Sequence, residues 1–127
     1  MGVEFDNNLP IYIQIMYYIK KQIVTGQLKE GDKIPSVREL ATELQINPNT
    51  VQRTFQELER EGIVETKRGM GRYVTKERGK IMDIKREMSK ELIQTFLKGM
   101  YSLGFTKEEI INVITGAVEN NQSRERE

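Results

Sequence analysis

Two helix starts lie close together between Ser36 and Pro48, and this spacing restricts the fold more than any other feature of the sequence. Ser36 and Glu39 form the pattern of a capping box, in which the serine side chain accepts from the Glu39 amide and the glutamate reaches back. Asn47 suits the N-cap of a second helix and Pro48 suits its first position, so the first helix must end near Gln45. Two helices joined across about two or three residues are typical of a helix-turn-helix.

A further helix is predicted before this pair, and a hairpin after it. Apolar residues recur every fourth position across residues 11–25, which is the spacing of one helix face, and a glycine follows. The helix that starts at Pro48 is expected to end at Gly62. Two short strands are predicted over 63–67 and 72–75, and the glycines between them suit a tight turn. The order helix, helix, helix, hairpin predicts a winged helix-turn-helix.

Two more helices are predicted after the hairpin. Apolar residues at helical spacing run from about Ile81 to Leu103, and Thr106 and Glu109 repeat the capping-box pattern before a last helix. The end of the chain is polar, and we expect it to fray. The fold class is therefore mainly α with a small β-hairpin. We divide the chain into a winged helix-turn-helix over residues 1–78, a two-helix region over 79–120 and a polar tail over 121–127.

The composition excludes several kinds of chemistry. The 127 residues include neither histidine nor cysteine, which excludes Ser-His-Asp and Cys-His catalysis, disulfides and ordinary zinc sites. No pair of acids stands out, so we expect no enzyme activity, no metal and no cofactor. The apolar runs are too short to span a membrane, and the N-terminus lacks the pattern of a signal peptide, so we expect a cytoplasmic protein.

Charge is sorted along the chain, although the net charge is only +1. In the helix from Pro48, Val51, Phe55 and Leu58 recur at core spacing, and a second face is polar and nearly free of acids. Such side chains can pair with base edges in the major groove of DNA. The alternative is an ordinary solvated face, but the acids usual on such a face begin only at Glu57. The polar face holds Asn49, Gln52, Arg53 and Gln56.

The predicted hairpin concentrates basic residues around a small tip. Gly69 and Gly71 make this tip small enough to approach the sugar-phosphate backbone or to enter a minor groove. A solvated hairpin whose cations guard a strand edge is the alternative interpretation. The bases of the hairpin are Lys67, Arg68, Arg72 and Lys76.

Four blocks of sequence, in order and at matching spacing, resemble the GntR-type regulators. The blocks are Leu9–Ile15, Pro35–Ala41, Asn47–Arg53 and Gly69–Val74. The short two-helix C-terminus looks like that of the YtrA-type subgroup. This sequence differs from the broader family at Pro48 and Gln52, where many members carry a basic residue. The resemblance implies DNA contacts from Arg38, from Asn49, Thr50 and Arg53, and from the tip at 69–71.

The two C-terminal helices are expected to pair with a second copy of the chain. About fifty residues follow the hairpin, too few for the ligand-binding domains that many GntR-type regulators append. Two apolar faces cannot easily be hidden from water without a partner. Packing on the winged region and a pocket for a small apolar ligand are the alternatives. The expected interface residues are Ile84, Met88, Leu92, Phe96, Met100, Ile110 and Ile114.

Together these features predict a sequence-specific regulator of transcription that binds double-stranded DNA, as a homodimeric repressor on an operator with two half-sites. The resemblance further implies control of an ABC-type transporter operon. The main alternative is a winged-helix protein-interaction module without DNA binding. An RNA binder would need exposed aromatic side chains for stacking, and most of those here lie on core faces. No feature identifies a small-molecule effector.

Overall fold

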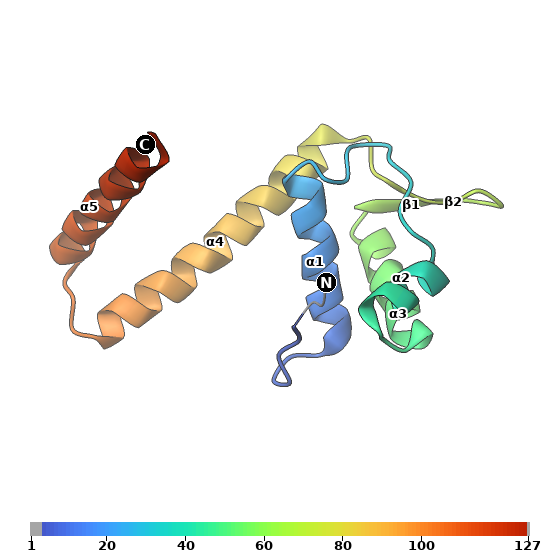
Figure 1. The fold of residues 1–127 in the computed structure, drawn as a ribbon, viewed down its shortest axis with the longest axis horizontal. Helices are drawn as coiled ribbons and strands as arrows, with labels where there is room; N and C mark the ends of the chain where they lie inside the picture. Colours follow the sequence, from blue (N-terminus) through green and yellow to red (C-terminus); the bar gives the residue numbers. More distant parts are fainter. Residues whose placement is uncertain (1–3, 127) are drawn as a thin grey trace. The chain divides into compact units, whose positions relative to one another are not determined.

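The computed structural model describes residues 4–126 and divides into two compact units, one ending at Arg86 and the other beginning at Glu87 (Figure 1). The boundary lies within the long helix α4 (Arg78–Ser102). The first unit also contains α1 (Ile11–Val24), α2 (Val37–Leu44), α3 (Pro48–Arg60) and the strands β1 (Val64–Lys67) and β2 (Gly71–Val74). The second unit contains the rest of α4 and α5 (Lys107–Arg126). Within the described residues, the helices are too short or too polar to cross a membrane.

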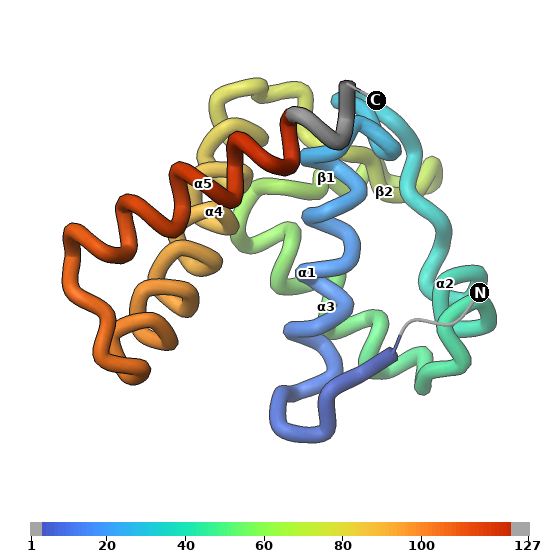
Figure 2. Tube along the Cα trace, turned by 60° about the vertical axis from the view of Figure 1, so that its left-hand side comes forward, coloured from blue at the N-terminus to red at the C-terminus, as the bar shows by residue number. Residues whose placement is uncertain are grey.

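The core of the first unit forms where α1 lies alongside α3 (Figure 2). Ile15 and Ile19 of α1 are fully or almost fully buried, as are Val51, Phe55 and Leu58 of α3, as the helical spacing predicted. Burying each such side chain contributes about 1.5–3 kcal/mol relative to leaving it in water. Rotating α3 would expose several of them together, so the opposite face of this helix is held in one orientation.

The predicted helix-turn-helix is confirmed, including the hydrogen bonds at its helix ends. The Glu39 amide donates to Ser36 Oγ at 3.1 Å, and the Ser36 amide donates to Glu39 Oε1 at 3.2 Å. These hydrogen bonds hold the pKa of Glu39 below its ordinary value. Gln45 ends α2 in the left-handed conformation, with a φ of 57°. The Asn47 side chain then accepts from the Asn49 amide at 2.8 Å and caps α3.

The hairpin is also confirmed, with strand bounds that differ from the predicted ones by one residue. β1 and β2 pair antiparallel, with Val64 opposite Val74 and Lys67 opposite Gly71. The loop before α2 adds an isolated bridge between Lys33 and Tyr73. The hairpin is thus tied to the helix-turn-helix through this loop as well as through α3.

α4 starts at Arg78 and not at the predicted Ile81. The Glu77 amide donates to Thr75 Oγ1 at 3.1 Å, and the Lys80 amide donates to the Glu77 carbonyl at 3.1 Å, so the first turn forms among polar residues. Apolar spacing cannot detect such a turn, because the turn carries no apolar side chains.

The second unit contains the predicted turn between helices. The Glu109 amide donates to Thr106 Oγ1 at 3.2 Å and the Thr106 amide donates to Glu109 Oε1 at 2.9 Å, which confirms the capping box. α5 continues to Arg126, so residues 121–126, expected to fray, are helical. Their polarity predicted exposure to water, but glutamine, arginine and glutamate are also good helix formers.

Candidate nucleic-acid interface

The outward face of α3 is open, as the sequence predicted. Asn49, Arg53 and Gln56 are exposed, and Thr50 and Gln52 are half-buried along its edges. None of the five residues is fully buried within the described part of the chain. The face therefore offers amide, hydroxyl and guanidinium groups to a partner outside the unit.

Arg53 is oriented by an aromatic ring of α1. Its guanidinium carbon lies 3.9 Å from the centre of the Tyr12 ring. Among residues 4–126, the Arg53 side chain makes neither a hydrogen bond nor an ion pair. Its N–H donors are therefore free although its position is restrained. The sequence predicted that Arg53 lies on the exposed face of α3, but it did not reveal the contact with Tyr12, because Tyr12 lies in another helix.

Arg72 has a different environment from the one the sequence suggested. Its Nε donates to Glu59 Oε1 at 2.8 Å, and its guanidinium carbon lies 4.9 Å from the centre of the Phe55 ring. Thr66 Oγ1 donates to the same carboxylate oxygen. Only 21% of the Arg72 side chain is exposed. Arg72, which the sequence predicts as a DNA contact, joins the hairpin to α3 in this structure.

Glu59 is a structural residue of this surface that the sequence did not single out. Partial burial raises the pKa of its carboxyl group, but hydrogen bonds from Thr66 and Arg72 and the charge of Arg72 outweigh that effect. The pKa therefore lies below its ordinary value and the group is a carboxylate at neutral pH. One carboxylate thus links both strands of the hairpin to α3.

The remaining basic residues of the hairpin lie at both of its ends, with Lys67 and Arg68 near the tip and Lys76 after β2. Arg68 and Lys76 are exposed, and Lys67 places its ammonium nitrogen 4.4 Å from the centre of the Tyr73 ring. Gly69 has a φ of 76°, a conformation that favours glycine, and a side chain added there would meet open space. Gly71 has a φ of 114° and lies close to the Lys33 side chain.

Met70 at this tip is 61% exposed, and sequence reasoning passed over it. Proteins that enter the minor groove often place an apolar side chain of this kind there. The position of Met70 between two glycines was the sequence feature that could have indicated an exposed apolar side chain at the tip.

Arg38 lies in the first turn of α2, and its side chain is exposed. Backbone N–H groups at the start of a helix attract phosphates, and a guanidinium group beside them adds to this attraction. The position is therefore suited to a contact with the DNA backbone.

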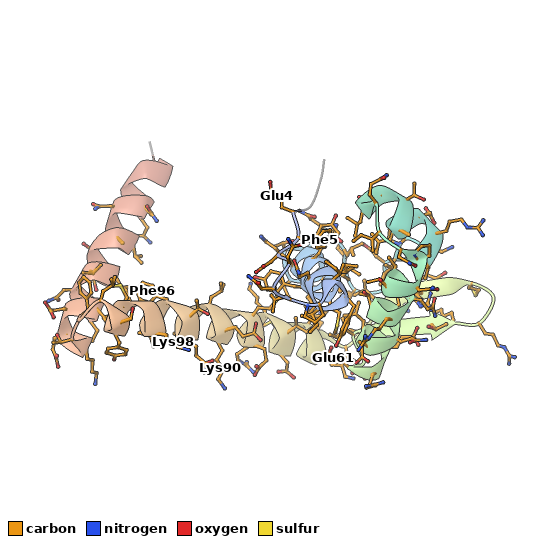
Figure 3. The ribbon with its side chains drawn as sticks, turned by 90° about the horizontal axis from the view of Figure 1, so that it is seen from below. Glu4, Phe5, Glu61, Lys90, Phe96 and Lys98 are labelled. Atoms are coloured by element: carbon orange, nitrogen blue, oxygen red, sulfur yellow. The ribbon has the colours of Figure 1, made fainter. Side chains whose placement is uncertain are left out.

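The second unit exposes apolar side chains on both of its helices. Leu92 is 64% exposed and Phe96, drawn on α4 in Figure 3, is 40% exposed. Two of the expected interface residues, Ile84 and Ile110, are already buried within the chain, whereas Met88 and Met100 are half-buried and Ile114 is exposed. Further exposed apolar residues of this unit are Ile93, Tyr101, Leu103, Ile111, Val113 and Val118.

Known proteins are similar to this chain in sequence and in fold. The family described as "Bacterial regulatory proteins, gntR family" matches residues 11–74. The chain is 43% identical to the HTH-type transcriptional repressor YtrA of Bacillus subtilis over 100 residues, which covers 74% of this chain and 77% of the repressor.

Two solved structures extend the comparison. A GntR family transcriptional regulator from Listeria monocytogenes has a TM-score of 0.81 and 45% identity, covering 88% of this chain and 98% of that one. The DNA-binding domain of AraR in complex with operator ORR3 has a TM-score of 0.52 and 28% identity, covering 59% of this chain and 88% of that one.

Proposed function

The chain belongs to the GntR family of bacterial regulatory proteins, which are transcription regulators and not enzymes, and from this premise we propose that it is a homodimeric repressor that recognises a specific sequence in double-stranded DNA. The observation that carries the proposal is the open polar face of α3 beside a hairpin with basic residues at its tip. The AraR domain bound to its operator, a relative of the winged unit, supports DNA as the partner.

In this proposal α3 lies in the major groove. Arg53 pairs with guanine, and the amide side chains of Asn49, Gln52 and Gln56 pair with adenine, each good bidentate pair discriminating by about 1–3 kcal/mol. Thr50, at the edge of this face, contacts the sugar-phosphate backbone of the DNA or the edge of a base. These contacts determine the sequence that is bound.

Contacts to the DNA backbone come from the helix and strand ends in this proposal. Arg38 in α2 and the bases Lys67, Arg68 and Lys76 of the hairpin neutralise phosphates, and the tip at 69–71 enters or borders the minor groove. Arg72 contributes indirectly, because it holds the hairpin against α3 through Glu59.

The homodimer in this proposal forms through the second unit. Both of its helices carry exposed apolar residues, and apolar residues that gather on an exposed surface are typical of protein–protein interfaces. A two-fold dimer reads two half-sites about one helical turn apart, roughly 34–36 Å, or a multiple of that distance. The resemblance to YtrA-type regulators supports an ABC-type transporter operon as the regulated unit, and DNA binding in a bacterium supports a cytoplasmic site of action.

Selection of bound duplexes from a random pool tests the proposal. We expect the full-length protein to enrich a motif with two-fold symmetry. Failure to enrich any motif, together with no retardation of any duplex at low salt, would contradict the proposal and favour a protein-interaction module.

A further inference from the structure

We propose that Tyr12 of α1 is a positioning residue for base recognition, because its ring holds the guanidinium group of Arg53 at the edge of the open polar face of α3. The proposal rests on the proposed function, since it concerns how one base-reading side chain is oriented. Tyr12 itself contacts no base in this proposal.

The stack joins two helices whose relative position is fixed. The guanidinium carbon of Arg53 lies 3.9 Å from the ring centre, and the Tyr12 side chain is half-buried. In the same place Thr54 Oγ1, which is fully buried, donates to the Tyr12 carbonyl at 3.4 Å and to the Thr50 carbonyl at 3.0 Å. The backbone of Tyr12, from which the ring extends, is therefore tied to a side chain of α3.

Stacking leaves the hydrogen-bonding edge of the guanidinium group available. The guanidinium carbon of Arg53 lies over the ring, and a guanidinium group that stacks on an aromatic face keeps its N–H donors along the edges of its plane. Arg72 provides the contrast within the same unit, because its guanidinium also lies over a ring, that of Phe55, but its Nε is occupied by Glu59. Arg72 is thus a link between elements, whereas Arg53 is restrained with its donors free.

A restrained arginine loses less conformational entropy when it pairs with a base than one that moves freely in water. Avoiding the cost of ordering one such side chain on binding corresponds to about a fivefold change in an equilibrium constant. The structure also permits the opposite role, in which the ring holds Arg53 away from DNA. The two roles predict opposite changes in affinity when the ring is removed.

The test uses the full-length protein, the operator selected by the wild type and a random duplex of the same length, with binding measured by fluorescence anisotropy. We expect Tyr12→Leu to weaken operator binding by about fivefold while binding of the random duplex stays almost unchanged. Tyr12→Phe keeps the ring and should bind like the wild type. Tyr17→Leu, which alters an exposed tyrosine of the same helix, is the matched control and should also bind like the wild type.

A double-mutant cycle separates positioning from a general effect on the fold. In an Arg53→Ala background, Tyr12→Leu should have no further effect on operator binding. The same fivefold loss in that background, or unchanged or tighter binding by Tyr12→Leu alone, would overturn the proposal. If Tyr12→Leu does not fold, Tyr12→Met, which retains apolar volume without a ring, replaces it with the same expectations. A wild type that binds no duplex would instead contradict the proposed function itself.

Discussion

Glu59 of α3 and Arg72 of β2 form an ion pair with a nitrogen–oxygen distance of 2.8 Å, and Thr66 of β1 donates to the same carboxylate. The pair joins the helix that carries the exposed polar face to the hairpin that carries Arg68 at its tip. Side chains that must reach adjacent grooves of one duplex have to keep a fixed separation. The ion pair is therefore one of the contacts that hold the hairpin in place relative to α3.

Replacing Glu59 by glutamine should lower the stability of the winged unit. The substitution removes the negative charge of the group that accepts from Arg72, and it leaves the shape of the side chain nearly unchanged. For a partly exposed ion pair we expect the free energy of unfolding to fall by about 1 kcal/mol. Thermal unfolding followed by circular dichroism measures it. Arg60→Ala, which breaks the exposed pair with Glu57, is the control and should cost less than about 0.5 kcal/mol. Equal losses for the two variants would contradict a structural role for Glu59.

The same ion pair predicts a dependence of stability on pH. Because the pKa of Glu59 in the folded chain lies below its ordinary value, its ionised form stabilises the fold above that value. This contribution disappears as the pH falls through the folded pKa. The stability difference between the wild type and Glu59→Gln should therefore be constant above about pH 5 and shrink below about pH 4. If the stability difference between the two proteins grew on acidification, the pKa of Glu59 would be raised in the folded chain and not lowered.

Charging the exposed apolar surface of α4 should dissociate the proposed dimer. Leu92→Glu places a carboxylate on a side chain that is 64% exposed in the chain, so the monomer should fold normally. Light scattering should report a monomer for this variant and a dimer for the wild type. Lys90→Glu introduces the same charge at a neighbouring exposed polar position and should remain a dimer. A dimeric Leu92→Glu protein would place the interface elsewhere.

Salt should weaken DNA binding steeply if the backbone contacts are as proposed. With about four phosphates neutralised by each subunit, the slope of log affinity against log salt concentration should be roughly −7 for the dimer. Arg68→Ala should weaken operator and random DNA alike and make the slope less steep by about two, one contact per subunit. A slope near zero for the wild type would be incompatible with these contacts.

The helix order of the winged unit could be predicted from sequence because its determinants are local. Ser36 and Glu39 are three residues apart, and Asn47 caps the helix that it precedes, so the hydrogen bonds at both starts follow from neighbours in the chain. Val51 and Phe55 show the same locality, because spacing along one helix decides which face is buried.

The contacts that orient Arg53 and Arg72 could not be predicted from local sequence patterns. Tyr12 and Arg53 lie in different helices, and Arg72 meets Glu59 across two elements, so these pairs depend on how the elements pack. A basic residue in a hairpin has the same sequence pattern whether its side chain faces DNA or pairs with a carboxylate of its own unit. The sequence predicts Arg72 as a DNA contact from its place beside the glycine tip, but it does not reveal the ion pair with Glu59.

The most direct test of the central claim, that the outward face of α3 reads bases, is a pair of selections from one random duplex pool with the wild type and with Arg53→Ala. We expect the wild-type motif to contain a base pair, placed symmetrically in both half-sites, whose preference is lost in the variant while the other positions persist. Identical motifs from the two proteins would contradict base recognition by Arg53.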